Sequence, residues 1–231
     1  MTERQLLLDL PPRDATGRSD FLPGQSNAAA LAALDRWPDW PGNALMIVGP
    51  GGAGRSHLAR IWQDRSGARL LTGRNVTAAL PEVLATTTPV ALDDADNIAG
   101  SATAEEALFH LINHLRQAGA SLLLTARETP GAWRLMLPDL ESRLLAIPPV
   151  HVAHPDDGLV YMVLAKLCDD RQMMVGPEVL DYLVARIDRS LSVARRVVAR
   201  LDELALTFHR RPTRALAAEA LASFTADPTA V

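Results

Sequence analysis

The segment at residues 49–56, Gly-Pro-Gly-Gly-Ala-Gly-Arg-Ser, limits what this chain can fold into more than any other segment. It matches the phosphate-binding loop pattern G-x-x-x-x-G-K-[ST], except that Arg55 stands where the pattern has lysine. The apolar run 44–48 before it predicts a buried strand, and residues 55–65 after it predict a helix. Such loops hold phosphates with backbone N–H groups and the helix N-terminus, so we expect a bound nucleotide; the alternative is a glycine-rich turn without a ligand. The residues expected to contact the nucleotide here are Gly49, Gly51, Gly52, Ala53, Gly54, Arg55, Ser56 and His57.

Arg55 makes hydrolysis a separate question from binding. The chain has 23 lysines and arginines, and Lys166 is the only lysine among them, so a general bias toward arginine explains part of the replacement. Lysine presents a compact point charge to the β- and γ-phosphates, whereas arginine presents a broad planar fork that sits differently. We therefore expect Arg55 to permit nucleotide binding and to disfavour fast hydrolysis. Whether the chain is an ATPase in its own right stays open.

Length and composition restrict the class of protein. A chain of 231 residues with 48% apolar residues can hold one large domain, or one medium and one small domain, around a sizeable core. The formal net charge of −4 provides no general attraction to nucleic acid. The single cysteine, Cys168, excludes an internal disulfide. No apolar run reaches the roughly 18–20 residues that span a membrane, and the N-terminus lacks the layout of a signal peptide, so we expect a cytoplasmic protein.

The order of apolar segments predicts three parts. Residues 1–20 are expected to form a flexible tail, because their second half is polar and contains proline and glycine. Residues 21–154 alternate strands and helices, which predicts an α/β domain with a parallel five-stranded sheet. Residues 155–231 contain only helical segments, which predicts a small all-helical domain. The expected strands are 44–48, 68–72, 89–93, 121–126 and 147–152, and the expected helices are 26–36, 55–65, 76–85, 103–118, 138–146, 156–171, 177–187, 191–209 and 213–224.

Two helix starts carry local signals. Ser26 or Asn27 is available as the N-cap of the helix at 26–36. Thr103 and Glu106 have the spacing of a capping box, which predicts that the long helix begins at residue 103.

Two carboxylates, Asp93 and Asp94, stand at the end of a buried strand about 40 residues after the loop. In a P-loop ATPase one such carboxylate holds Mg²⁺, usually through water, and the next orients the attacking water. Ser56 would ligate the same ion directly, so Ser56 and Asp93 are the expected metal site. A solvated loop is the alternative interpretation of the two aspartates.

Three further positions are candidates for contact with phosphate. Thr125 ends another buried strand and could bind the γ-phosphate or the attacking water, although such a hydroxyl can also satisfy local backbone. Arg143 ends a short helix, from which an arginine can reach a neighbouring subunit's γ-phosphate; a surface salt bridge is the alternative. Arg195 and Arg196 lie on the long helix of the second domain, where one of them, preferably Arg195, could face the nucleotide; a solvated helix face is the alternative.

Taken in order, these segments resemble the AAA+ ATPases, and among them the replication initiator DnaA. The order is a P-loop at 49–56, an acidic strand end at 90–94, a polar strand end at Thr125, an arginine finger at Arg143 and a helical lid with Arg195. Residues 21–27, Phe-Leu-Pro-Gly-Gln-Ser-Asn, resemble the segment that helps hold the adenine in DnaA. The resemblance covers roughly residues 20–225 and implies adenine contacts from Phe21, Leu22 and Asn27.

The N-terminal segment narrows the resemblance further. The run Gln5, Leu6, Leu7, Leu8, Asp9 and Leu10 looks like the short peptide that docks on the β sliding clamp, with residues 11–20 as its tether. A lone DnaA-like module with such a peptide is similar to the Hda family of DnaA inactivators. The resemblance implies bound ADP, or ATP, with Mg²⁺; DnaA and the clamp as partners; contact with DNA only through the clamp; and no membrane association. It also implies that Arg143 acts in trans on the initiator's ATP.

Other functions remain open at this stage. One is a stand-alone AAA+ ATPase such as a helicase loader, which Arg55 disfavours. Another is a DNA-binding variant of the initiator. The acidic net charge disfavours it, and so does the short stretch expected after the lid, which leaves no room for the helix-turn-helix domain of initiators. Because AAA+ faces are complementary head to tail, a homodimer is one assembly that such a chain can form.

Overall fold

The computed structural model describes residues 17–225, so the segment Gln5 to Leu10 lies outside the described residues. Five parallel strands form one sheet in the order β2-β3-β4-β1-β5, which confirms the predicted parallel five-stranded sheet. The strands are β1 (Ala44–Val48), β2 (Arg69–Thr72), β3 (Val90–Asp93), β4 (Leu122–Ala126) and β5 (Pro149–His151). The last is shorter than expected and lies at the edge of the sheet, where a proline is tolerated.

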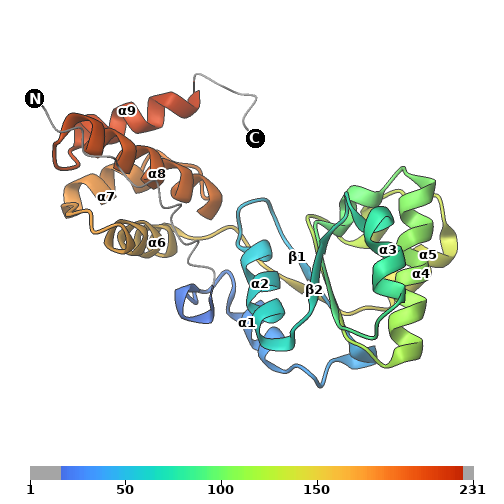
Figure 1. Cartoon of the computed structure of the whole chain (residues 1–231). Helices are drawn as coiled ribbons and strands as arrows, with labels where there is room; N and C mark the ends of the chain where they lie inside the picture. Colours follow the sequence, from blue (N-terminus) through green and yellow to red (C-terminus); the bar gives the residue numbers. More distant parts are fainter. Residues whose placement is uncertain (1–16, 226–231) are drawn as a thin grey trace, which may run out of the picture.

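Helices cover both faces of the sheet. Figure 1 shows α1 and α2 on one side and α3, α4 and α5 on the other. Strand β1 is buried along its whole length, and its side chains alternate between the two cores, with Leu45 and Ile47 on the α1/α2 side and Met46 and Val48 on the other. These helices are α1 (Ala28–Asp35), α2 (Arg55–Ser66), α3 (Val76–Leu84), α4 (Ala102–Ala118) and α5 (Pro138–Leu145).

The start of α4 differs from the sequence prediction. Ser101 is its N-cap, and the Ser101 hydroxyl accepts a hydrogen bond from the N–H of Ala104. Thr103 and Glu106 lie inside the helix and form no capping box, so that prediction was wrong. The carboxylate that reaches back is Glu105, which accepts the N–H of Gly100. The helix begins one residue earlier than expected because a serine already stands at the cap position.

Between β5 and residue 225, where the described part of the chain ends, four helices pack around their own apolar core. They are α6 (Asp157–Asp170), α7 (Pro177–Val184), α8 (Leu191–Phe208) and α9 (Arg214–Thr225). Leu164, Leu183, Val197 and Leu201 are fully or almost fully buried in this core. Figure 1 shows this bundle beside the α/β part, joined to it by the segment after β5. Within residues 17–225, no helix is both long and apolar enough to cross a bilayer.

The end of the predicted tail is structured. Arg18–Asp20 form one turn of 3-10 helix, and Asp20 makes an ion pair with Lys166 of α6. The expectation of a flexible segment up to residue 20 was therefore wrong for its last residues, because Asp20 finds a partner far along the chain.

Candidate nucleotide-binding site

The loop at 49–54 connects β1 to α2 and has the backbone that glycine permits. Gly52 and Gly54 have φ angles of 75° and 99°, in the left-handed region where other residues are strained. Gly52 also lies against the helical bundle: its carbonyl accepts the N–H of Leu191, and a Cβ here would stand 1.9 Å from the Ser190 Oγ. The first turn of α2 follows directly, and its N–H groups are the ones a helix leaves without internal partners. The loop and helix together form a site suited to an anion.

A cavity lies between this loop and the helical bundle. Its volume is about 150 Å³, which is smaller than the roughly 300–1,000 Å³ of pockets that enclose small molecules. The bundle lies close on the loop, so a nucleotide would require the bundle to move outward. The wall consists of Asp20, Phe21, Leu22, Gly52, Gly54, Arg55, Ser56, His57, Val163, Lys166, Leu167, Asp170, Leu191, Ser192 and Arg195.

The wall includes part of the predicted nucleotide-contacting set. Gly49, Gly51 and Ala53 are not among its residues. A Cβ at Gly49 would stand 2.3 Å from the carbonyl oxygen of Val152, so this glycine allows the loop to pass the end of the sheet. Asn27 is also absent from the wall: it is buried, its side chain accepts the N–H of Gly24, and it donates to the carbonyl of Leu22. In this structure Asn27 supports the segment that carries Phe21 and Leu22 and does not itself face the cavity.

Arg55 makes an ion pair with the second strand-end carboxylate. Its side chain is only 6% exposed, and Nη2 donates to Oδ1 of Asp94 at 2.9 Å. The other terminal nitrogen, Nη1, is buried and has no hydrogen-bond partner among residues 17–225. The guanidinium therefore neutralises Asp94 and retains one buried donor for another acceptor.

Thr125 connects the two carboxylates. Its hydroxyl donates to Oδ1 of Asp93 at 2.5 Å and accepts the N–H of Asp94 at 2.9 Å. Thr125 is fully buried, and neither it nor the two aspartates belong to the cavity wall. Contact between Thr125 and a γ-phosphate stays a prediction, since the hydroxyl here is engaged by its neighbours.

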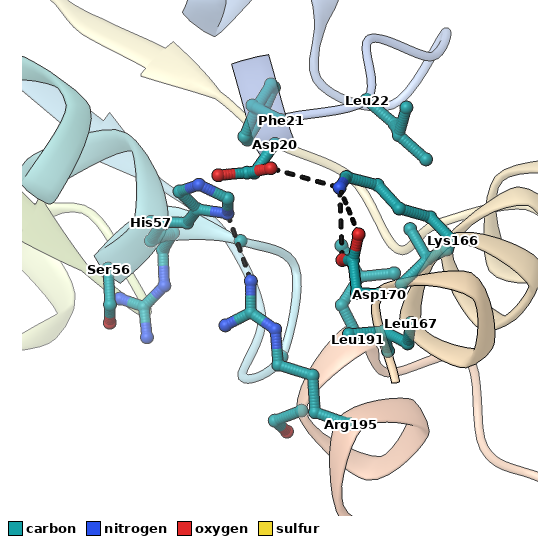
Figure 2. A pocket seen from close by; sticks show the side chains of 15 residues that line it. Asp20, Phe21, Leu22, Ser56, His57, Lys166, Leu167, Asp170, Leu191 and Arg195 are labelled. Atoms are coloured by element: carbon teal, nitrogen blue, oxygen red, sulfur yellow. Dashed lines mark hydrogen bonds and ion pairs between the residues drawn. The ribbon is translucent and has the colours of Figure 1, made fainter. Parts of the chain in front are cut away.

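Arg195 faces the cavity from the helical bundle. Its Nη2 lies 3.0 Å from Nδ1 of His57, a contact visible in Figure 2. Phe21 packs edge-on against the same imidazole, with ring centroids 5.2 Å apart. The adjacent Arg196 instead lies over the ring of Phe224, 5.3 Å from its centroid, within the bundle. Of the two arginines, Arg195 is the one placed to contact a ligand.

The sequence analysis missed an ion-pair cluster in the same cavity. Lys166 Nζ lies 3.0 Å from Asp20 Oδ1 and 3.0 Å from Asp170 Oδ2. Dashed lines in Figure 2 mark both ion pairs. The hydrogen bond from Lys166 holds the pKa of Asp20 below its ordinary value, and the hydrogen bonds to Asp20 and Asp170 raise the pKa of Lys166. The signal in the sequence was that Lys166 is the only lysine in a chain biased toward arginine.

Arg143 stands apart from this site. It lies on α5 with its guanidinium carbon 4.9 Å from the ring centroid of Phe109. It borders a second cavity together with Ala44 and Leu122, which begin β1 and β4. The P-loop follows the opposite end of β1, so Arg143 and the P-loop lie at opposite ends of this strand.

The P-loop after β1, the strand order and the helical bundle over the loop together define an AAA+ fold. The structure is similar to domain III of the replication initiation protein DnaA from Thermotoga maritima, with a TM-score of 0.79 and 19% identity, covering 93% of this chain and 99% of that one. It is also similar to AMPPCP-bound DnaA from Aquifex aeolicus, with a TM-score of 0.65 and 18% identity; 80% of this chain matches 63% of that chain. The RuvB Holliday junction branch migration motor of Thermotoga maritima has a TM-score of 0.65 at 16% identity, over 90% of this chain and 72% of that chain. The fold is therefore that of a DnaA-like AAA+ module.

Comparison of sequences also finds relatives of this chain. A protein of Haemophilus influenzae described as uncharacterized is 28% identical over 220 residues, which are 91% of this chain and 95% of that protein. No family model matches the chain.

Proposed function

We propose that this protein regulates the initiation of chromosome replication. It would hold an adenine nucleotide, ADP, bind the DNA-loaded sliding clamp, and stimulate hydrolysis of ATP by the initiator DnaA in trans. The observation that carries this proposal is the Arg55–Asp94 ion pair, because it leaves the chain able to hold phosphate but occupies one of its own catalytic carboxylates. The DnaA-like fold over 93% of the chain supports the choice of partner.

Hydrolysis by the chain itself would be slow for a physical reason. A carboxylate that orients the attacking water must accept a hydrogen bond from that water. Here Asp94 accepts from Arg55, and one oxygen of Asp93 accepts from Thr125. One oxygen of each strand-end carboxylate is thus engaged by a protein group, which leaves fewer oxygens to orient the attacking water.

Nucleotide recognition would use the P-loop side of the cavity for the phosphates and the segment with Phe21 and Leu22 for the rest of the nucleotide. Gly52, Gly54 and the first turn of α2 would hold the phosphates, while Phe21 and Leu22 line the wall beside the helical bundle. Ser56 and Asp93 offer the hydroxyl and carboxylate oxygens that suit Mg²⁺, which would offset phosphate charge when bound. Within residues 17–225, no group of three or more His, Cys, Asp or Glu side chains is arranged to hold a metal ion by itself.

Arg143 would act on the partner's nucleotide. It is partly exposed on α5 and lies away from its own P-loop. Two apolar side chains at or near the ends of α5 are exposed, Met136 at 65% before the helix and Leu145 at 59% at its last residue, which suits a surface that packs against another AAA+ subunit. An arginine finger supplied in trans stabilises charge that develops on the γ-phosphate. The clamp would bind Gln5 to Leu10, ahead of the structured turn at Arg18–Asp20.

Two variants separate the proposed activities. Arg143→Ala should abolish stimulation of DnaA ATP hydrolysis on clamp-loaded DNA while clamp binding is unchanged. Gln5→Ala should abolish clamp binding while the fold, followed by circular dichroism, is unchanged. The matched control is Arg116→Ala, because Arg116 is exposed and borders the same cavity as Arg143. Full stimulation by both Arg143→Ala and Gln5→Ala would refute the proposed mechanism.

A stand-alone AAA+ ATPase such as a helicase loader is the second candidate. It is favoured by the presence of both strand-end carboxylates, Asp93 and Asp94, beside the P-loop. Robust ATP turnover by the isolated chain would support it, and turnover near background would support the regulator. Tight, salt-sensitive binding to duplex DNA would instead support a DNA-binding initiator variant.

A further inference from the structure

We propose that Arg55 is a built-in counter-charge of the phosphate site, so that this protein binds ADP without needing a divalent cation. The inference rests on the proposed function, because it concerns how the same site holds its nucleotide. It assigns to one side chain two simultaneous partners, Asp94 and the β-phosphate of ADP.

The first step is the position of the guanidinium. Arg55 is the first residue of α2, and it lines the cavity beside Gly54 and Ser56. Nη2 is already committed to Asp94 at 2.9 Å, whereas the buried Nη1 has no acceptor within residues 17–225. A buried N–H donor without an acceptor is unfavourable, and Arg55 is a residue of the cavity wall, so we assign a ligand oxygen as the partner of Nη1.

The second step is the difference between arginine and lysine. A guanidinium is planar and presents five donors in a fixed fork, so its two terminal nitrogens can bind two anions at once. A lysine presents a single nitrogen, so it can serve both the phosphate and Asp94 only if both acceptors lie close to that one atom. In this chain Arg55 can neutralise the carboxylate and still donate to phosphate.

The third step is the charge that a metal would otherwise offset. In a P-loop site, Mg²⁺ offsets the negative charge of the phosphates and of the nearby carboxylates. Here Asp94 is neutralised by Arg55, and Oδ1 of Asp93 accepts the hydroxyl of Thr125. One oxygen of each carboxylate is therefore already occupied by a protein group and is less available to hold the cation, so we expect the contribution of Mg²⁺ to ADP affinity to be small.

The test compares ADP affinity with and without the metal. The full chain, freed of nucleotide, is titrated with ADP by calorimetry in excess EDTA and in excess Mg²⁺. For the wild type, the two dissociation constants are expected to agree within about threefold, whereas Mg²⁺ is expected to tighten ADP binding to Arg55→Lys by about tenfold or more. Arg60→Lys, on the same helix but away from the cavity wall, should behave as the wild type does.

The outcomes separate the inference from the proposed function. The inference is overturned if the wild type binds ADP only with Mg²⁺, or if its ADP affinity depends on Mg²⁺ as strongly as that of Arg55→Lys. The proposed regulatory function is not affected by that outcome. If the wild type binds no ADP under either condition, the inference and the nucleotide-holding part of the proposed function both fail. Should Arg55→Lys not fold, the wild-type comparison alone decides.

Discussion

Replacing Glu105 by alanine is expected to destabilise the α/β part of the protein strongly. Its side chain is completely buried, and it accepts hydrogen bonds from three backbone N–H groups in two separate segments. One carboxylate oxygen accepts the N–H of Gly100 at 3.1 Å, and the other accepts those of Met136 and Leu137 at 2.8 and 2.9 Å. The last two residues lead into α5, so Glu105 also holds the approach to the helix that carries Arg143.

The magnitude follows from the three donors that lose their acceptor. Each hydrogen bond to a charged group contributes about 1.5–3 kcal/mol, which sets an upper limit near 5–9 kcal/mol for three. Met136 is 65% exposed, so water can reach part of this segment after the change. We therefore expect a loss of about 3–5 kcal/mol in the free energy of unfolding for Glu105→Ala. Glu105→Gln keeps one carbonyl acceptor and should cost about 1–2 kcal/mol.

Urea unfolding followed by tryptophan fluorescence measures this loss. All four tryptophans of the chain, Trp37, Trp40, Trp62 and Trp133, lie in the α/β part, so the signal reports its unfolding and not that of the helical bundle. Glu106→Ala is the matched control, since Glu106 is the exposed neighbour on the same helix and should change stability by less than about 0.5 kcal/mol. A Glu105→Ala variant within about 0.5 kcal/mol of the wild type would show that these bonds do not support the fold as argued.

Three further expectations concern single residues in the helical bundle or in the loop beside it. Hydrogen bonds to Asp20 and Asp170 raise the pKa of Lys166, so acetic anhydride at pH 8 should acylate this lysine more slowly in the folded chain than in urea. The variant Asp20→Asn should raise the rate in the folded chain. Equal rates in the folded and unfolded chain, measured by mass spectrometry, would contradict this expectation. Burial raises the pKa of the Cys168 thiol from 9.0 to about 11, above its unfolded value, so its contribution to stability is present below pH 9 and is lost as pH rises to about 11. Thermal unfolding of the wild type, followed by circular dichroism, should show this loss of stability between pH 9 and 11, and Cys168→Ala should remove it. If Cys168→Ala keeps the pH dependence of the wild type, ionisation of the buried thiol is not its cause. Gly52 has a φ of 75°, where alanine is strained, so Gly52→Ala should distort the phosphate-binding loop and weaken ADP binding by about tenfold or more; an unchanged dissociation constant would argue against this loop conformation.

Much of the fold was predictable because its signals are local. Strand β1 is a continuous apolar run, as a strand buried on both faces must be, and its predicted bounds match the structure. The alternation of strands and helices was enough to predict a parallel sheet, because parallel strands need crossover connections. The start of α4 was misjudged by one residue because Ser101 and Thr103 both carry hydroxyls that can cap, and only the surrounding contacts choose between them.

The sequence by itself determined that a phosphate-binding loop precedes a helix and that two carboxylates end a nearby strand. Only the tertiary structure decided what these groups contact. Arg55 and Asp94 are 39 residues apart, and their pairing depends on which way a long side chain turns once β3 lies in the sheet. Lys166 and Asp20 lie in different parts of the chain and meet only because the bundle packs close to the P-loop. Periodicity and motif spacing record which residues share a face, whereas side-chain partners follow from packing between distant segments, which neither pattern encodes.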